Sequence, residues 1–179
     1  RRNADLELLV AERTAEISEQ TRRLVTSKQE VIAAQAATIT AFCALAEARD
    51  NETGNHIRRT QHYVRILAEK LQDHPRFRGE LNEEIIQLLF KSAPLHDVGK
   101  VATPDAILLK QGKLTPEEWV IMKLHCEYGR NAIVQAENAL GGAVDASFLR
   151  YAAEIAYGHH ERWDGNGYPN GLKGEEIPL

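Results

Sequence analysis

Thr115-Pro116-Glu117-Glu118 is the clearest helix start in this chain of 179 residues. Threonine caps the first backbone N–H groups, proline is tolerated at the first helical position, and acidic side chains are favourable near the positive end of the helix dipole. We therefore predict a helix from this point to about Leu140, where Gly141-Gly142 ends it.

Further helix signals lie on both sides of this stretch. Residues 4 to about 50 contain neither glycine nor proline and predict one long helix. A second helix is predicted over 55–71, a third from the N-cap Asn82, and a fourth over 147–157. No run of residues alternates convincingly as a strand would. The predicted fold class is therefore all-α.

Two regions should interrupt the helices. Pro94 should kink or break the third helix, and Gly99 begins a predicted loop. After Trp163 the glycine-rich run 164–171 predicts a tight loop in which its glycines, Gly165, Gly167 and Gly171, take positive φ.

Composition excludes several classes of protein. The charge balance is 22 − 26 = −4, which argues against binding a nucleic-acid polymer and against a polybasic membrane anchor. No window approaches 18 consecutive apolar residues, so we expect no membrane span. Cys43 and Cys126 are too far apart in sequence to form a CxxC pair, which favours a reducing, cytoplasmic location. Without an initial methionine or a signal peptide, the chain is expected to be a piece of a longer protein.

The N-terminal helix carries a weak heptad pattern. One seam is apolar apart from Thr38, and the other is polar at Arg13, Gln20 and Ser27. The helix is therefore either a solvated linker or a dimerising helix that transmits a signal from an upstream domain. The apolar seam of this helix consists of Val10, Ile17, Leu24, Val31 and Leu45.

We assign residues 1–41 to the long helix and residues 42–179 to the domain that follows it.

The seven histidines carry the functional prediction. Glu52 and His56 are four residues apart and would share a helical face. His96 and Asp97 are adjacent, so both reach one site only at a junction, which Gly99 supplies, or in a bridging arrangement. Imidazole and carboxylate without thiolate suit manganese, iron, zinc or nickel. Two such ions can activate a hydroxide and stabilise in-line displacement at phosphorus, and a neighbouring lysine can neutralise a phosphate oxygen.

Other aromatic residues have simpler interpretations. His62 is predicted to lie on a helix surface and His74 in a loop before Pro75. Trp163 either stacks on the ring of a bound ligand or, as we expect for a large aromatic beside a turn, packs under the loop.

Five motifs occur in order over about residues 42–179. They are Ala48–Arg59 (ARDNETGNHIRR), Leu95–Lys100 (LHDVGK), Thr103–Leu108 (TPDAIL), Leu114–Trp119 (LTPEEW) and Gly158–Pro169 (GHHERWDGNGYP). Together they resemble the HD-GYP family. The family resemblance implies an HD-type helical bundle after the long N-terminal, coiled-coil-like helix, and a metal-dependent phosphodiesterase that opens the bacterial second messenger cyclic di-GMP.

The resemblance also assigns roles to residues. His96, Asp97 and Lys100 match the catalytic core, in which Asp97 bridges the ions and Lys100 contacts the scissile phosphate. Glu52 is similar to members that hold three metals rather than two, usually iron or manganese, and that carry hydrolysis through pGpG to GMP. The matched metal ligands are Glu52, His56, His96, Asp97, His125, His159 and His160.

Arg59 matches the motif arginine, with a structural or phosphate-facing role. The loop residues Gly167, Tyr168 and Pro169 either form a surface for partners such as GGDEF-domain proteins and shape the pocket, or only lock a turn. The N-terminal helix resembles the connector of a response regulator and would make the protein a homodimer. Alternatives to cyclic di-GMP hydrolysis are a non-catalytic interaction module and a hydrolase of another nucleotide.

The chain departs from the family pattern at its end. In the family, Ile177-Pro178-Leu179 runs into further helices that carry another metal-binding aspartate. We therefore expect a C-terminally truncated domain that lacks one carboxylate, exposes apolar surface, and is inactive alone if that aspartate is essential.

Overall fold

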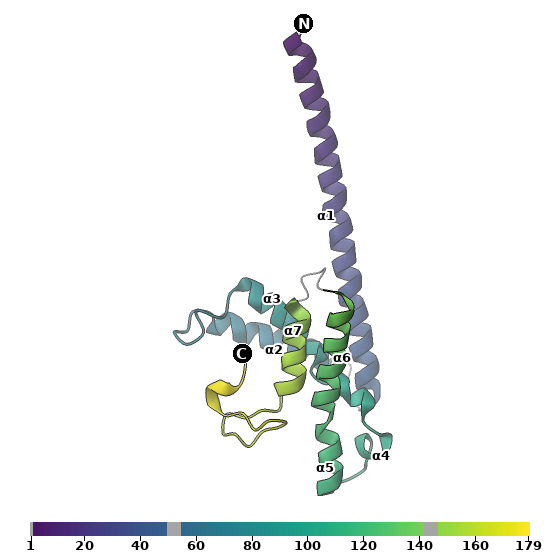
Figure 1. Ribbon diagram of the computed structural model, residues 1–179, viewed down its shortest axis with the longest axis vertical. Coiled ribbons are helices and arrows are strands. Elements are labelled where there is room, and N and C mark those ends of the chain that lie inside the picture. Colours follow the sequence, from purple (N-terminus) through teal and green to yellow (C-terminus); the bar gives the residue numbers. More distant parts are fainter. Residues whose placement is uncertain (1, 50–54, 142–146) are drawn as a thin grey trace. The chain divides into compact units, whose positions relative to one another are not determined.

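The computed structural model describes residues 2–49, 55–141 and 147–179. These residues form helices and loops, and an isolated bridge between Asp164 and Lys173 is the only β pairing among them. The all-α prediction is confirmed (Figure 1). The α-helices are α1 (Arg2–Arg49), α2 (His56–Leu71), α3 (Glu83–Ser92), α4 (Asp105–Leu108), α5 (Pro116–Lys123), α6 (His125–Ala139) and α7 (Ser147–Gly158), and the 3-10 turns are η1 (Ala93–Leu95), η2 (Val98–Ala102) and η3 (Gly174–Glu176).

Contacts divide the chain into two units, Arg1–Ile39 and Thr40–Leu179. In the first unit, the described part of α1 buries almost nothing. Its seam residues are exposed, Leu24 by 71 % and Ile17 by 62 %. Ion pairs one turn apart, such as Arg13 with Glu16 at 2.6 Å, support the helix locally.

One helix, within Asp5–Arg49, is long and apolar enough to cross a membrane by length and composition. The sequence prediction counted consecutive apolar residues and missed this window, because scattered polar residues lower its mean hydropathy only slightly. The measure is weak evidence for a span, since core helices of soluble proteins also satisfy it. Cys43 and Ala46, near the end of this helix, are buried in the second unit.

The core of the second unit lies where α2, α3 and α7 meet. Ile86 and Leu89 of α3 are buried there against Ala68 of α2. Burying one such aliphatic side chain contributes about 1.5–3 kcal/mol. Ser92, at the end of α3, donates a hydrogen bond to the backbone carbonyl of Phe148 on α7 (2.7 Å). This bond fixes the end of α3 to the start of α7.

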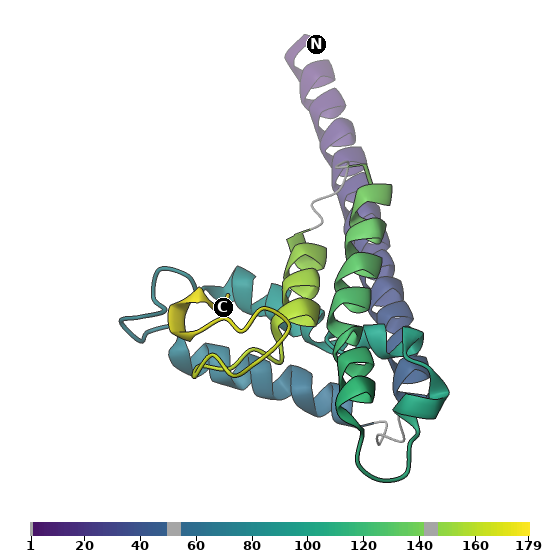
Figure 2. The same ribbon diagram turned by 60° about the horizontal axis from the view of Figure 1, so that its bottom comes forward.

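A second contact brings η2 and α7 onto α6. Helices α6 and α7 run side by side (Figures 1 and 2). Gly129 of α6 allows this approach, because a Cβ there would lie 3.4 Å from the Cβ of Ala156. Gly99 of η2 is more tightly enclosed, since a Cβ on it would lie 1.9 Å from the backbone oxygen of His125. These contacts place the start of α6 against η2.

Local predictions around α3 and α5 are largely confirmed. Asn82 accepts a hydrogen bond from the backbone N–H of Ile85 (2.9 Å), and Thr115 forms a capping box with Glu118. The helix of α3 ends before Pro94, where the chain continues as the 3-10 turn η1. Gly99, predicted in a loop, lies in the 3-10 turn η2.

The single helix predicted from Thr115 to Leu140 is wrong, because the chain breaks at Leu124 into α5 and α6. The N–H of Leu124 bonds the carbonyl of Ile121, three residues back (3.1 Å). The Nδ1 atom of His125 also hydrogen-bonds the backbone carbonyl of Met122 (2.7 Å), three residues back, and this contact tightens the turn. The break thus depends on a hydrogen bond of the His125 side chain, which the periodicity of apolar residues does not predict.

The glycine-rich loop corrects two expectations. Gly165 and Gly171 take positive φ as predicted (79° and 69°), but Gly167 does not. Gly167 is instead required by space, because a Cβ there would lie 2.4 Å from the backbone nitrogen of Arg162. Trp163 does not pack under the loop, since it is 60 % exposed. The guanidinium of Arg76 covers its ring at 4.7 Å and supplies a partner without burial.

Candidate metal centre

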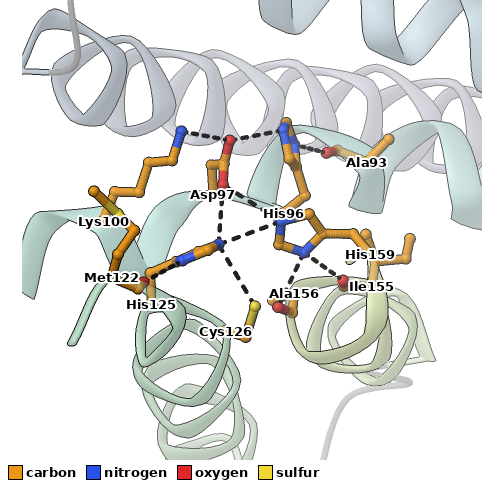
Figure 3. A network of polar contacts seen from close by, with 10 residues as sticks. All are labelled: Ala93, His96, Asp97, Lys100, Met122, His125, Cys126, Ile155, Ala156 and His159. Atoms are coloured by element: carbon orange, nitrogen blue, oxygen red, sulfur yellow. Dashed lines mark hydrogen bonds and ion pairs between the residues drawn. The ribbon is translucent and has the colours of Figure 1, made fainter. Parts of the chain in front are cut away.

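The predicted junction at His96 and Asp97 is present. His96 closes η1 and Asp97 opens η2, so two short turns meet between adjacent residues. Asp97 has φ −102° and ψ 7°, outside the α-helical region. The change of direction lets both side chains face one site, and Lys100 follows one turn later (Figure 3).

The two carboxylate oxygens of Asp97 face different groups. Oδ2 lies 3.1 Å from Nε2 of His96 and 3.1 Å from Nζ of Lys100. Oδ1 lies 3.4 Å from Nε2 of His125 and 3.4 Å from Nε2 of His159. A carboxylate divided in this way can bridge two cations, one on each side.

Backbone carbonyls set the tautomers of three histidines. The Nδ1 atom of His96 lies 2.9 Å from the carbonyl of Ala93, and Nδ1 of His125 lies 2.7 Å from that of Met122. Nδ1 of His159 lies 3.1 Å from the carbonyl of Ile155. A carbonyl only accepts, so each Nδ1 carries the donated proton and the Nε2 lone pair of the neutral ring is available to a metal.

The resulting arrangement fits a cation. Nε2 of His125 and Nε2 of His159 are 3.4 Å apart and face the same oxygen of Asp97. That oxygen is shielded from solvent and has no hydrogen-bond partner among the described residues. Three electron-pair donors therefore converge, which a divalent ion would stabilise. One ligand atom from each of Asp97, His125, His159 and His160 lies within 4.8 Å of the others.

The electrostatics support neutral imidazoles beside a charged carboxylate. Burial lowers the pKa of His125, and burial with the charges of His159 and His125 lowers the pKa of His160 to about 4. Burial alone would raise the pKa of Asp97, but its contacts with His159, His96 and Lys100 hold that pKa well below its usual range. Burial opposes protonation of His96 too, yet Asp97 raises its pKa. A metal on this side would therefore compete with a proton for His96.

The remaining predicted ligands are less completely described. His56, at the start of α2, places its ring centroid 5.7 Å from that of His96. Glu52 lies outside the described residues. Arg59 is exposed on α2, and the described contacts do not join its side chain to the site. His62 and His74 are exposed, as predicted.

The glycine-rich loop shapes one wall of the site. Tyr168 stacks on His160 with ring centroids 4.5 Å apart, and its N–H bonds the carbonyl of His160 (3.2 Å). The carboxylate of Glu161 accepts from the backbone N–H groups of Asn170 (2.7 Å) and Leu172 (2.9 Å). Sequence reasoning assigned Glu161 no role, although it lies within the motif Gly158–Pro169, three residues before the glycine-rich run.

Two hollows adjoin these side chains. A groove of about 570 Å³, walled mainly by apolar residues of α2, α3, α7 and the C-terminal segment, reaches His96 and His159. Exposed apolar surface was expected, and Leu67 in this groove is 60 % exposed. A smaller cavity of about 20 Å³ is lined by Cys43, Ala46, Glu47, His56, Ile57, Pro94, His96, Asp97, Val98 and Lys100.

Comparison with known proteins agrees with this geometry. The family model described as HD domain matches residues 20–179. The chain belongs to the HD domain family. Its His96-Asp97 pair and its Gly-Tyr-Pro loop, which meet in one site, place it in the HD-GYP branch of that family.

Three relatives illustrate the likeness. A probable cyclic di-GMP phosphodiesterase of Vibrio cholerae is 54 % identical over 81 % of this chain and 32 % of its own length. The cyclic di-GMP phosphodiesterase response regulator RpfG of Xanthomonas campestris is 39 % identical over 88 % of this chain and 38 % of its own. The 3'3'-cGAMP-specific phosphodiesterase 2 of Vibrio cholerae is 43 % identical over 74 % of this chain and 22 % of its own. This HD-GYP chain thus spans 22–38 % of the length of these three relatives.

Proposed function

We propose that this chain carries the catalytic centre of a metal-dependent phosphodiesterase that hydrolyses cyclic di-GMP. The observation that carries the proposal is the division of the Asp97 carboxylate between two sets of nitrogen donors. His125 and His159 face one oxygen, while His96 and Lys100 face the other. The names of the two relatives at 54 % and 39 % identity support the substrate.

The donor set favours manganese or iron, two ions per centre, with a third if Glu52 also contributes. Imidazole nitrogen and carboxylate oxygen suit these ions, and thiolate is lacking because burial raises the pKa of Cys126 to about 12. When bound, the ions would activate water and offset charge at phosphorus. Asp97 would hold them together, His125 and His159 would orient their side of the centre, and Lys100 would neutralise a non-bridging phosphate oxygen.

Asp97→Ala tests the proposal. The substitution removes both bridging oxygens. We therefore expect the rate of cyclic di-GMP hydrolysis, measured by chromatography of the products, to fall by at least about 10²–10³-fold. Metal content by plasma mass spectrometry should fall with it. Asp73→Ala, at an exposed carboxylate, is the matched control and should keep both. The assay uses this chain and a chain extended past Leu179. Near-normal turnover by Asp97→Ala would refute the two-metal mechanism.

Hydrolysis of a hybrid cyclic dinucleotide is the second candidate. The relative named a 3'3'-cGAMP-specific phosphodiesterase, at 43 % identity, favours it specifically. Asp97 and Lys100 would contact the metal ions and the phosphate group. These contacts are the same for both substrates, so they do not distinguish one base from another. A panel of cyclic di-GMP, 3'3'-cGAMP and cyclic di-AMP, compared by kcat/KM, separates the two. A preference for 3'3'-cGAMP above tenfold would replace the first proposal.

A further inference from the structure

The small cavity beside Asp97 receives a carboxylate that the predicted ligand set does not include. His96 and Lys100, the partners of Oδ2, line this cavity together with His56, whereas His125, His159 and His160 do not. The cavity therefore lies on the Oδ2 side of Asp97. Its volume of about 20 Å³ is enough for one water-sized guest.

Glu47 lines the same cavity from the last turn of α1. Both of its carboxylate oxygens are shielded from solvent. Imidazole and carboxylate groups that line one cavity can share a divalent ion, because both are ordinary ligands of manganese and iron.

The end of α1 is fixed firmly enough to present Glu47 at a defined place. Cys43, one turn before Glu47, and Ala46, the residue directly before it, are buried (2 % and 8 % exposed). Arg49 bonds the backbone carbonyls of Val101 and Thr103, which follow Lys100. The guanidinium thereby ties the last turn of α1 to η2, the element that carries Lys100.

Cys43 does not compete with Glu47 for a metal. Burial, with a further contribution from the charge of Glu47, raises the pKa of the Cys43 thiol to about 11. The thiol is thus protonated at neutral pH, and a protonated thiol is a poor ligand. The cavity therefore keeps the oxygen and nitrogen character that manganese and iron share.

We propose that Glu47 is a further carboxylate of the metal centre and contributes to holding the ion on the Oδ2 side of Asp97, together with His56 and His96. This inference rests on the proposed metal-dependent function. It makes the end of the long N-terminal helix part of the centre itself, so that a displacement of that helix end would change metal occupancy.

Manganese titration of the 179-residue chain, followed by the electron paramagnetic resonance signal of free Mn²⁺, tests the inference without any substrate. We expect Glu47→Gln to weaken one manganese by about 10–100-fold, while the ion facing His125 and His159 keeps its affinity. Glu47→Asp keeps the charge and should recover part of the loss. Glu30→Gln, at an exposed glutamate of the same helix, should bind as the wild type does.

The possible outcomes are distinguishable. If Glu47→Gln and the wild type give the same isotherm, Glu47 serves only the packing or pairing of α1 and the inference is overturned. If the wild type itself binds as little manganese as Asp97→Ala, the proposed metal centre fails as a whole, and the role of Glu47 fails with it. Thermal unfolding with a chelator checks that each variant is folded. If Glu47→Gln is unfolded, the test passes to Glu47→Asp, whose shorter side chain should still lower the affinity of one ion.

Discussion

Gly99→Ala is the sharpest test of how the centre is built. The added Cβ would lie 1.9 Å from the backbone oxygen of His125 and 2.5 Å from the backbone nitrogen of Gly129. Since real Cβ atoms essentially never approach within 3.0 Å, η2 must retreat from α6 by about 3.0 − 1.9 = 1.1 Å. Overpacking usually costs 1–3 kcal/mol. Because both obstacles are backbone atoms that cannot rotate away, we expect about 3 kcal/mol or more.

Two assays follow from this displacement. At about 3 kcal/mol, the midpoint of thermal unfolding by circular dichroism should fall by roughly 6–12 °C. The distance between Oδ1 of Asp97 and Nε2 of His125, now 3.4 Å, would also grow, and a misplacement of about 1 Å can cost 10²-fold in activity. Manganese affinity should therefore fall in the folded fraction as well.

Gly79→Ala provides the matched control, because a Cβ on Gly79 meets no described atom within 4 Å. Its unfolding free energy should stay within about 0.5 kcal/mol of the wild type. If Gly99→Ala is as stable as Gly79→Ala, then the close approach of η2 to α6 does not exist in solution. The placement of Asp97 opposite His125 would then lose its structural basis.

Two further predictions concern the His160 wall of the centre. The pKa of His160 lies at about 4, below its ordinary 6.5, so between these values the unfolded chain binds more protons. In a chelator, stability to urea should therefore decrease as pH falls from 6.5 towards 4 and should be unaffected by His160 above that window. His160→Gln should flatten this slope, and parallel slopes would contradict the assignment. Tyr168→Ala, which removes the ring stacked on His160, should lower the unfolding free energy by about 0.5–1.5 kcal/mol beyond the lost area, whereas Tyr168→Phe should keep it. Equal losses in the two variants would show that stacking is not what Tyr168 contributes.

The fold was predictable wherever a local rule determines the structure. The capping box at Thr115 and the proline that ends α3 depend only on neighbouring residues, and both are present. The break at Leu124 was not predictable in this way. It depends on the ring of His125 taking the carbonyl of Met122, and periodicity records only where apolar residues recur.

The same division applies to the centre. The residue types and the His96-Asp97 junction were readable because adjacent ligands demand a change of direction. The split of the two Asp97 oxygens was not readable from the sequence. It depends on the packing of α6 and α7, which brings His125 and His159 to Oδ1, while His96 and Lys100 face Oδ2. Gly99 and Gly167 show why. Gly99 was predicted to begin a loop and Gly167 to take positive φ in a tight loop, yet each is required because another backbone passes too close to leave room for a Cβ.

Glu47 is a residue that the family motif does not reveal. The ligand set transferred by resemblance starts at Glu52, so Glu47, which lies five positions earlier in the sequence, looks like an ordinary helix residue. Its shielding from solvent and its place beside His56 and His96 emerge only when α1 is packed against η1 and η2. A residue of this kind links helix packing to metal affinity. Changes at the end of α1 are therefore expected to alter the centre before they unfold the domain.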